Sequence, residues 1–270
     1  MTAPIPDSSG RFLPVIETWG AAGGAALGET AGDLILVCEH ASNTFPAPWG
    51  DLGLTADQQR AHIAWDPGAL GLMRGLARRL GAVTIHATVT RLIYDCNRAP
   101  DMAGAMPAQS ELHAVPGNAA IAVTERAARS EAVYLPFHAA LHGLIAGRIA
   151  QGCRPAVITV HSFTPVYFGK PRAVEFGVIH DADTRLARAI LAEAEARTTL
   201  ACGLNAPYSA ADDVTHTLRL QATPYGLLNA MLEIRNDLIA TPADEEAMAD
   251  RLAPVIAAAL ARCRAPAEAA

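Results

Sequence analysis

The stretch DLILVCEHASN, residues 33–43, joins an apolar run to a cluster of polar residues. Residues 33–38 form a short apolar run bounded by turn signals, a pattern that favours a buried strand. Glu39, His40 and Asn43 follow where that strand would end. Because strands buried on both faces are typical of parallel sheets, the stretch predicts an α/β protein with polar side chains at the end of a central strand.

The rest of the chain alternates between predicted strands and helices. Further apolar runs predict strands at residues 82–87, 92–96, 156–161, 176–180 and 229–234. Periodicity and capping residues predict helices that begin after Thr55 and at Asp66, and others at residues 123–151 (bent at Pro136), 184–197 and 242–261. Residues 99–122 are expected to form a long irregular loop. This alternation indicates a mainly parallel sheet covered by helices on both faces.

The sequence contains no internal repeat and no linker, so we expect a single domain over residues 1–270. Its core should span about 30–262, after an extended lead-in rich in Pro, Gly, Ser and Ala. The last eight residues, from Cys263 onward, are expected to form a frayed tail.

Composition and charge exclude several classes of function. The formal net charge is −6 and no block of Lys or Arg stands out, which argues against nucleic acid as a partner. A small anionic substrate needs only one or two well-placed arginines. No signal peptide and no apolar run of about 18 residues is visible, so no membrane partner is expected. Five scattered cysteines without a C-x-x-C pair favour a reducing, cytoplasmic location. The oligomeric state is left open.

Polar residues gather at four of the predicted strand ends, where open α/β sheets bind their ligands. These residues are Glu39 with His40, Asn97 with Arg98, His161 with Ser162, and Glu233 with Arg235. Each alone has a structural explanation, such as a hydrogen-bonded core histidine or a turn asparagine. Buried charge is costly unless it is paired or bound to a metal, so their joint occurrence at one edge favours a functional site.

Several stretches at these strand ends carry a family resemblance. The chain resembles the N-formylglutamate amidohydrolase family in VCEHASN, HIAWDPGA, RLIYDCNRAP, VHSFTPV, LNAPYS and LEIRNDLI. The resemblance implies a three-layer αβα fold with a mixed, mainly parallel sheet, phosphorylase/hydrolase-like and distantly related to zinc carboxypeptidases. It also implies zinc-dependent hydrolysis of N-formyl-L-glutamate or a close N-acyl amino acid. The carboxypeptidase signature H-x-x-E is not matched, because Asn43 stands at that spacing from His40.

A catalytic zinc ion needs three protein ligands and an open position. His40 and His161 offer two nitrogens. For the oxygen ligand we favour Asp66, on the resemblance, with a plain helix N-cap as its structural alternative. Glu39 ranks second, because on an extended strand its side chain should point away from that of His40.

The remaining candidates concern proton transfer and the substrate anion. Glu233 is the candidate general base, since a carboxylate beside the metal can take a proton from water and pass it to the leaving nitrogen. Asn97 and Arg98 resemble the family pair that grips the substrate carboxylate. Arg91 and Arg235 are further candidates for binding that anion or the developing oxyanion, and each could equally form a structural salt bridge. A carboxypeptidase-like or glutamyl-amide hydrolase and a metal-free dicarboxylate-binding protein are the alternative functions.

Overall fold

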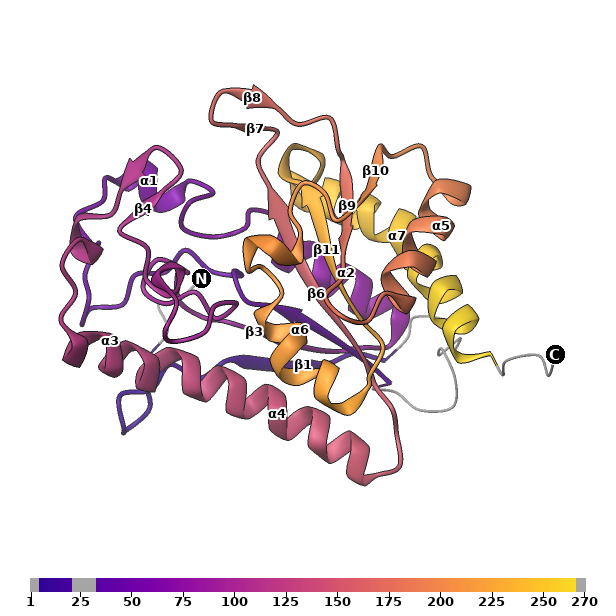
Figure 1. The fold of residues 1–270 in the computed structure, drawn as a ribbon, viewed down its shortest axis with the longest axis horizontal. Helices are drawn as coiled ribbons and strands as arrows, with labels where there is room; N and C mark the ends of the chain where they lie inside the picture. The colour runs from indigo at the N-terminus through magenta and orange to yellow at the C-terminus, as the bar shows by residue number, and fades with distance from the viewer. Residues whose placement is uncertain (1–4, 21–32, 266–270) are drawn as a thin grey trace.

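The computed structural model describes residues 5–20 and 33–265, so parts of the expected lead-in and tail lie outside the described residues. The described chain has three layers, a central sheet between two layers of helices (Figure 1). The expected αβα fold with a mixed, mainly parallel sheet is confirmed. None of the helices within the described residues is long and apolar enough to cross a membrane.

The central sheet has seven strands. In spatial order they are β1 (Val15–Thr18), β3 (Val83–His86), β2 (Leu34–Cys38), β6 (Ala156–Phe163), β11 (Asn229–Arg235), β9 (Phe176–Ile179) and β10 (Cys202–Leu204). Strands β3, β2, β6 and β11 are parallel to one another. Strand β1 runs antiparallel to β3, and the pair β9 and β10 runs antiparallel to β11. The four parallel strands therefore bring their carboxyl ends to one edge.

Two layers of helices cover the sheet because its central strands are apolar on both faces. One face packs against α2 (Ala69–Leu80), α5 (Arg185–Arg197) and α7 (Pro242–Arg264). The other is covered by α4 (Leu135–Ala150), α6 (His216–Gln221) and the long loops (Figure 1). Successive side chains alternate between the faces, so His161 and Glu233 point to the α4 side, as Val157 and Met231 do.

The remaining elements are short and lie mostly above the carboxyl edge. They are α1 (Ala56–Arg60), α3 (Val123–Arg129), the hairpin of β4 (Gln109–Ser110) with β5 (His113–Ala114), and the hairpin of β7 (Val166–Tyr167) with β8 (Lys170–Pro171). Single 3-10 turns are η1 (Ala103–Ala105), η2 (Pro116–Asn118), η4 (Ala210–Asp212), η5 (Thr223–Tyr225) and η6 (Asn236–Ile239). Thr55 caps α1 as expected, within a capping box.

The expected strand at residues 92–96 is absent: this segment is buried but irregular. Its backbone groups bind side chains instead of a neighbouring strand. The Leu92 carbonyl accepts from Asn118 Nδ2 at 2.7 Å, and the Cys96 carbonyl accepts from His138 Nε2 at 2.8 Å. Asn118 Oδ1 in turn accepts from the buried Arg129 at 2.8 Å. Because buried backbone groups need partners of some kind, these side chains replace a strand ladder.

The long helix expected at residues 123–151 forms as three consecutive segments, α3, a π-helical turn η3 (Ser130–Tyr134) and α4. A bend was expected at Pro136, and the structure places the π-helical turn shortly before this proline. Proline has no N–H to donate to the preceding turn, and the Leu135 N–H reaches back to the Ser130 carbonyl.

Three expected boundaries are wrong. Helix α2 begins at Ala69 rather than at Asp66, because Gly68 holds a left-handed φ of 79° in front of it. Asp66 is therefore no N-cap, and its side chain is free to serve elsewhere. Helix α7 continues to Arg264 beyond the expected start of the tail, and the expected lead-in contains the strand β1.

Candidate functional site

Three buried side chains meet at the carboxyl edge of the sheet. His40 lies just past β2, His161 lies on β6, and Asp66 lies between α1 and α2. His161 Nδ1 is 2.9 Å from Asp66 Oδ2 and 3.1 Å from His40 Nδ1, and His40 Nδ1 is 3.2 Å from the same Asp66 oxygen. Ligand atoms around one tetrahedral zinc ion stand about 3.4 Å apart, given metal–ligand bonds near 2.1 Å. The three atoms therefore form a nearly complete set of ligands.

The backbone fixes this arrangement locally. The Asp66 N–H donates to the His40 carbonyl at 2.9 Å, which ties the segment before α2 to the end of β2. The Ser162 N–H lies 3.3 Å from Asp66 Oδ2, and the Ser162 hydroxyl donates to the Pro67 carbonyl at 2.8 Å. The three elements that carry the ligand atoms are thus hydrogen-bonded to one another next to the site.

Each histidine has a second carboxylate at its other nitrogen. His40 Nε2 lies 2.7 Å from Asp95 Oδ1, and His161 Nε2 lies 3.2 Å from Glu39 Oε2. Glu39, the rival for the oxygen ligand, therefore stands behind His161 and outside the set of three. Asp95 was missed by the sequence analysis. A usable signal existed, since Asp95 stands two residues before Asn97 within a stretch that matches the family.

The electrostatics of the site favour a cation among these groups. Burial alone would raise the pKa of Asp66, but the charges and hydrogen bonds of His40 and His161 outweigh burial and lower it. Burial alone would lower the pKa of His161, but Glu39 and Asp66 outweigh it and raise that pKa well above its ordinary value. Positive charge is therefore stabilised between the carboxylates. Two imidazole nitrogens and one carboxylate oxygen are a donor set that fits a divalent transition metal.

Glu233 faces the same cavity from β11. It pairs with His161 in the register of β11 and β6, so both side chains leave the sheet on one face. Its Oε2 atom is buried and has no hydrogen-bond partner among the described residues. Burial raises the pKa of Glu233 to about 7. On the other side of Glu233 stands Gly177, where a Cβ would lie 2.0 Å from the Ala206 carbonyl oxygen, so a side chain there would displace the adjoining loop.

These groups line a cavity of about 170 Å³. Eight side chains were proposed from the sequence as metal ligands, general base or substrate-binding groups. Seven of them line this cavity: His40, Asp66, Arg91, Asn97, Arg98, His161 and Glu233. The eighth, Arg235, lies outside the lining. Its guanidinium instead contacts Asp237 at 2.8 Å and Glu175 at 3.4 Å. The structure therefore favours the structural salt bridge, one of the two explanations given for Arg235.

Comparison with known proteins agrees with this geometry. The family model of N-formylglutamate amidohydrolase matches residues 32–240. The chain belongs to the N-formylglutamate amidohydrolase family. Membership makes it a hydrolase of a family that acts on amide bonds, and the resemblance seen in the sequence is confirmed.

Two solved structures are similar to this member of the N-formylglutamate amidohydrolase family. A gene product of Agrobacterium tumefaciens shares 46% identity at a TM-score of 0.88, over 95% of this chain and 98% of that one. The N-formylglutamate amidohydrolase of Ralstonia eutropha shares 17% identity at a TM-score of 0.63, over 90% and 95% of the two chains, which shows a common fold. No curated protein matches the chain in sequence.

Three polar residues of the amidohydrolase cavity differ in how many of their hydrogen-bonding groups are already bonded to other residues of the protein. Both ends of the Asn97 amide are engaged: its Nδ2 donates to the Val214 carbonyl, and its Oδ1 accepts from the Thr217 N–H at 3.0 Å. Arg91 contacts Asp95 Oδ2 at 2.6 Å and Asp66 Oδ1 at 3.4 Å. Arg98 donates from Nη1 to the Asn97 carbonyl at 2.9 Å, its one hydrogen bond within the described residues. Of the three, Arg98 has the most donors left for a ligand.

The amidohydrolase cavity is also lined by residues that the sequence analysis missed. Glu111 connects two walls: its Oε2 contacts His62 Nε2 at 2.8 Å, and its Oε1 accepts from the Phe168 N–H at 2.9 Å. Tyr167 and Tyr208 line the same cavity. No sequence pattern marks Glu111, because its partners lie 49 and 57 residues away along the chain.

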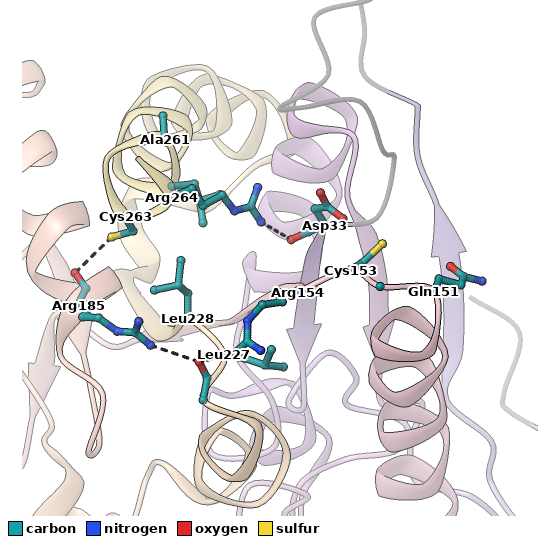
Figure 2. Close-up of a pocket in the computed structure, with 13 residues that line it drawn as sticks. Asp33, Gln151, Cys153, Arg154, Arg185, Leu227, Leu228, Ala261, Cys263 and Arg264 are labelled. Carbon is teal, nitrogen blue, oxygen red and sulfur yellow. Dashed lines mark hydrogen bonds between the residues drawn. The ribbon is translucent and has the colours of Figure 1, made fainter. Parts of the chain in front are cut away.

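A larger cavity of about 810 Å³ lies at the opposite edge of the amidohydrolase sheet (Figure 2). Asp33 and Leu228, which precede β2 and β11, belong to its lining. Two of its exposed arginines bind backbone carbonyls, Arg185 that of Gly226 at 3.3 Å and Arg264 that of Asp33 at 2.7 Å. The cavity shares no residue with the site at the carboxyl edge, so its size does not make it the reaction site.

Proposed function

We propose that this protein hydrolyses N-formyl-L-glutamate, or a related N-acyl amino acid, with one zinc ion per chain. One observation carries the proposal: the ligand atoms of His40, Asp66 and His161 converge beside a buried, unpaired Glu233 in a single cavity. Three N and O ligands with room for a fourth are typical of catalytic rather than structural zinc. The cavity, at about 170 Å³, suits a small substrate.

His40, Asp66 and His161 are the residues that would hold the ion. When bound, zinc supplies positive charge that polarises the amide carbonyl and makes water more acidic. Glu233 takes the proton of the attacking water on a carboxylate oxygen and gives it to the leaving nitrogen. A pKa of about 7, raised by burial, suits both halves of that task near neutral pH.

Arg98, Arg91 and Asn97 bind the substrate carboxylate or hold the other groups of the site in place. Arg98 binds the substrate carboxylate, since its forked donors match that group and most of them have no partner in the described part of the chain. Arg91 is engaged by Asp66 and Asp95, so it contributes charge and holds these carboxylates in place. Asn97 holds the chain in position through the Val214 carbonyl and the Thr217 N–H.

The proposal is tested by assaying purified protein against N-formyl-L-glutamate, N-acetyl-L-glutamate, glutamyl amides and dipeptides with a free C-terminal carboxylate. We expect formate and glutamate from the first, loss of turnover with a chelator, and recovery when zinc is added back. Turnover of dipeptides alone would indicate a carboxypeptidase-like enzyme instead. Zinc-independent binding of glutamate without turnover of any compound would indicate a binding protein.

A further inference from the structure

Glu39 has no role in the proposed reaction, yet its carboxylate is completely buried under the site. Its Oε2 lies 3.2 Å from His161 Nε2. Neither carboxylate oxygen makes a geometrically well-formed hydrogen bond with another described residue. An unpaired buried carboxylate costs several kcal/mol, and the ion pair with His161 offsets part of this cost.

The two nitrogens of His161 face different groups. Nδ1 points to Asp66 and His40, at 2.9 and 3.1 Å, and Nε2 points to Glu39. A histidine binds a metal through the nitrogen that lacks a proton. A carboxylate at the other nitrogen keeps the proton there and fixes the ring. Glu39 is placed to do this for His161, as Asp95 is for His40 at 2.7 Å.

Two residues that are neighbours in the chain reach opposite sides of one ring. Glu39 and His40 follow β2 directly and form a turn there. His40 approaches His161 at Nδ1, and Glu39 approaches it at Nε2. The pair Glu39-His40 thus supplies one proposed metal ligand, His40, and the carboxylate that contacts the outer nitrogen of another, His161.

We infer that Glu39 is a positioning residue that fixes the tautomer and ring orientation of His161 for metal binding. The inference rests on the metal site of the proposed function and is independent of the substrate. It assigns to Glu39 the work of an outer-shell carboxylate, whose removal typically weakens metal binding about 10–100-fold.

The test is the zinc dissociation constant of Glu39→Gln, measured by chelator competition at constant pH, with Glu175→Gln as the matched control. Glu175 is a carboxylate that pairs with Arg235 outside the cavity. We expect weaker zinc binding by about 10–100-fold in Glu39→Gln and wild-type binding in the control. Nitrogen NMR of the metal-free proteins, at a pH where the His161 ring is neutral, should show a single tautomer protonated at Nε2 in wild type and a mixture of tautomers in Glu39→Gln.

The results that would contradict the role of Glu39 can be told apart from those that would contradict the metal site. Wild-type zinc affinity in a less stable Glu39→Gln would reduce Glu39 to a structural ion pair and leave the proposed function intact. A wild-type protein that binds no zinc would overturn the metal site itself. Should Glu39→Gln fail to fold, Glu39→Met removes the buried charge and fills the space. The same loss of zinc affinity is expected of it, and its absence would equally refute the inference.

Discussion

Glu233 and His161 occupy paired positions on the neighbouring parallel strands β11 and β6. Their side chains therefore leave the sheet side by side on one face, held by the strand ladder rather than by loops. His40 and Asp66 lie in the loop segments after β2 and before α2. The hydrogen bond from the Asp66 N–H to the His40 carbonyl holds these two segments together. Strand positions keep Glu233, the proposed general base, and His161, a proposed ligand, at the fixed separation that proton transfer needs.

Removing both histidine ligands should abolish metal binding. In His40→Ala/His161→Ala, one carboxylate oxygen is left from the set of three, which is too few for a stable zinc site. We expect zinc to fall from about one per chain to near zero, with activity lost in parallel. Metal analysis of dialysed protein measures this, and full zinc occupancy in the double variant would refute the proposed site.

Glu233→Gln should separate chemistry from binding. The amide keeps the size of the side chain but cannot accept a proton, so kcat should fall by about 10²–10⁴-fold, towards the upper end because both proton transfers use one group. Zinc content and fold should be unchanged. Measuring kcat on zinc-loaded variant, with Tm alongside, checks this. Turnover close to wild type would remove Glu233 from the mechanism.

Arg98→Lys should weaken recognition of the substrate carboxylate. The charge is kept but the fork is lost, so kcat/KM should fall roughly tenfold or more, equivalent to at least about 1.4 kcal/mol. Arg235→Lys is the matched control, because Arg235 lies outside the cavity and pairs with Asp237. An equal loss on an acyl amine that lacks the carboxylate would contradict the assignment.

Glu233 should lower the stability of the metal-free protein as the pH rises from about 4.5 to about 7. Burial raises the pKa of Glu233 from 4.5 to about 7, so the folded state keeps a proton that the unfolded chain has released. The contribution of Glu233 to the free energy of unfolding therefore falls by roughly 3 kcal/mol across this window. His138 contributes in the opposite direction, because burial lowers its pKa to about 4. Urea unfolding with a chelator should show wild type losing stability relative to Glu233→Gln as the pH rises, and a difference between the two proteins that does not change with pH would contradict this.

Asn118→Ala should destabilise the irregular segment at residues 92–96. Asn118 donates to the carbonyls of Leu92 and Pro107, at 2.7 and 3.0 Å, and accepts from the buried Arg129 at 2.8 Å. Unsatisfied buried groups cost about 1–3 kcal/mol each, so we expect a loss of about 2–4 kcal/mol in the free energy of unfolding. Urea denaturation measures it. A loss below about 1 kcal/mol would mean that water replaces the side chain.

The central strands could be predicted from sequence because their signal is local. Residues 33–38 and 156–161 are short apolar runs with turn signals, and both form buried strands. Residues 92–96 look alike in sequence but form no strand, since their carbonyls bind Asn118 and His138 far along the chain. The reversed direction of β9 likewise depends on pairing that no local pattern records.

The residues of the candidate site likewise divide into those with a local sequence signal and those that depend on contacts between distant segments. Residues that stand directly at strand ends, such as His40, His161 and Glu233, were found from sequence and lie together. Arg235 also stands at a strand end, but it pairs with its chain neighbour Asp237 and with the distant Glu175 outside the cavity. Glu111 was missed because it stands in a hairpin turn and meets the cavity only through tertiary contacts.

The two outer strands of the sheet are short, with four residues in β1 and three in β10. Each pairs on one side within the described sheet, and β10 is followed at once by Asn205 with a left-handed φ of 51° and by a cis bond before Pro207. An unpaired strand edge is a template on which another chain can add a strand. With so few backbone groups in line, the sheet offers a poor template for aggregation, although its inner strands are among the most apolar segments of the chain.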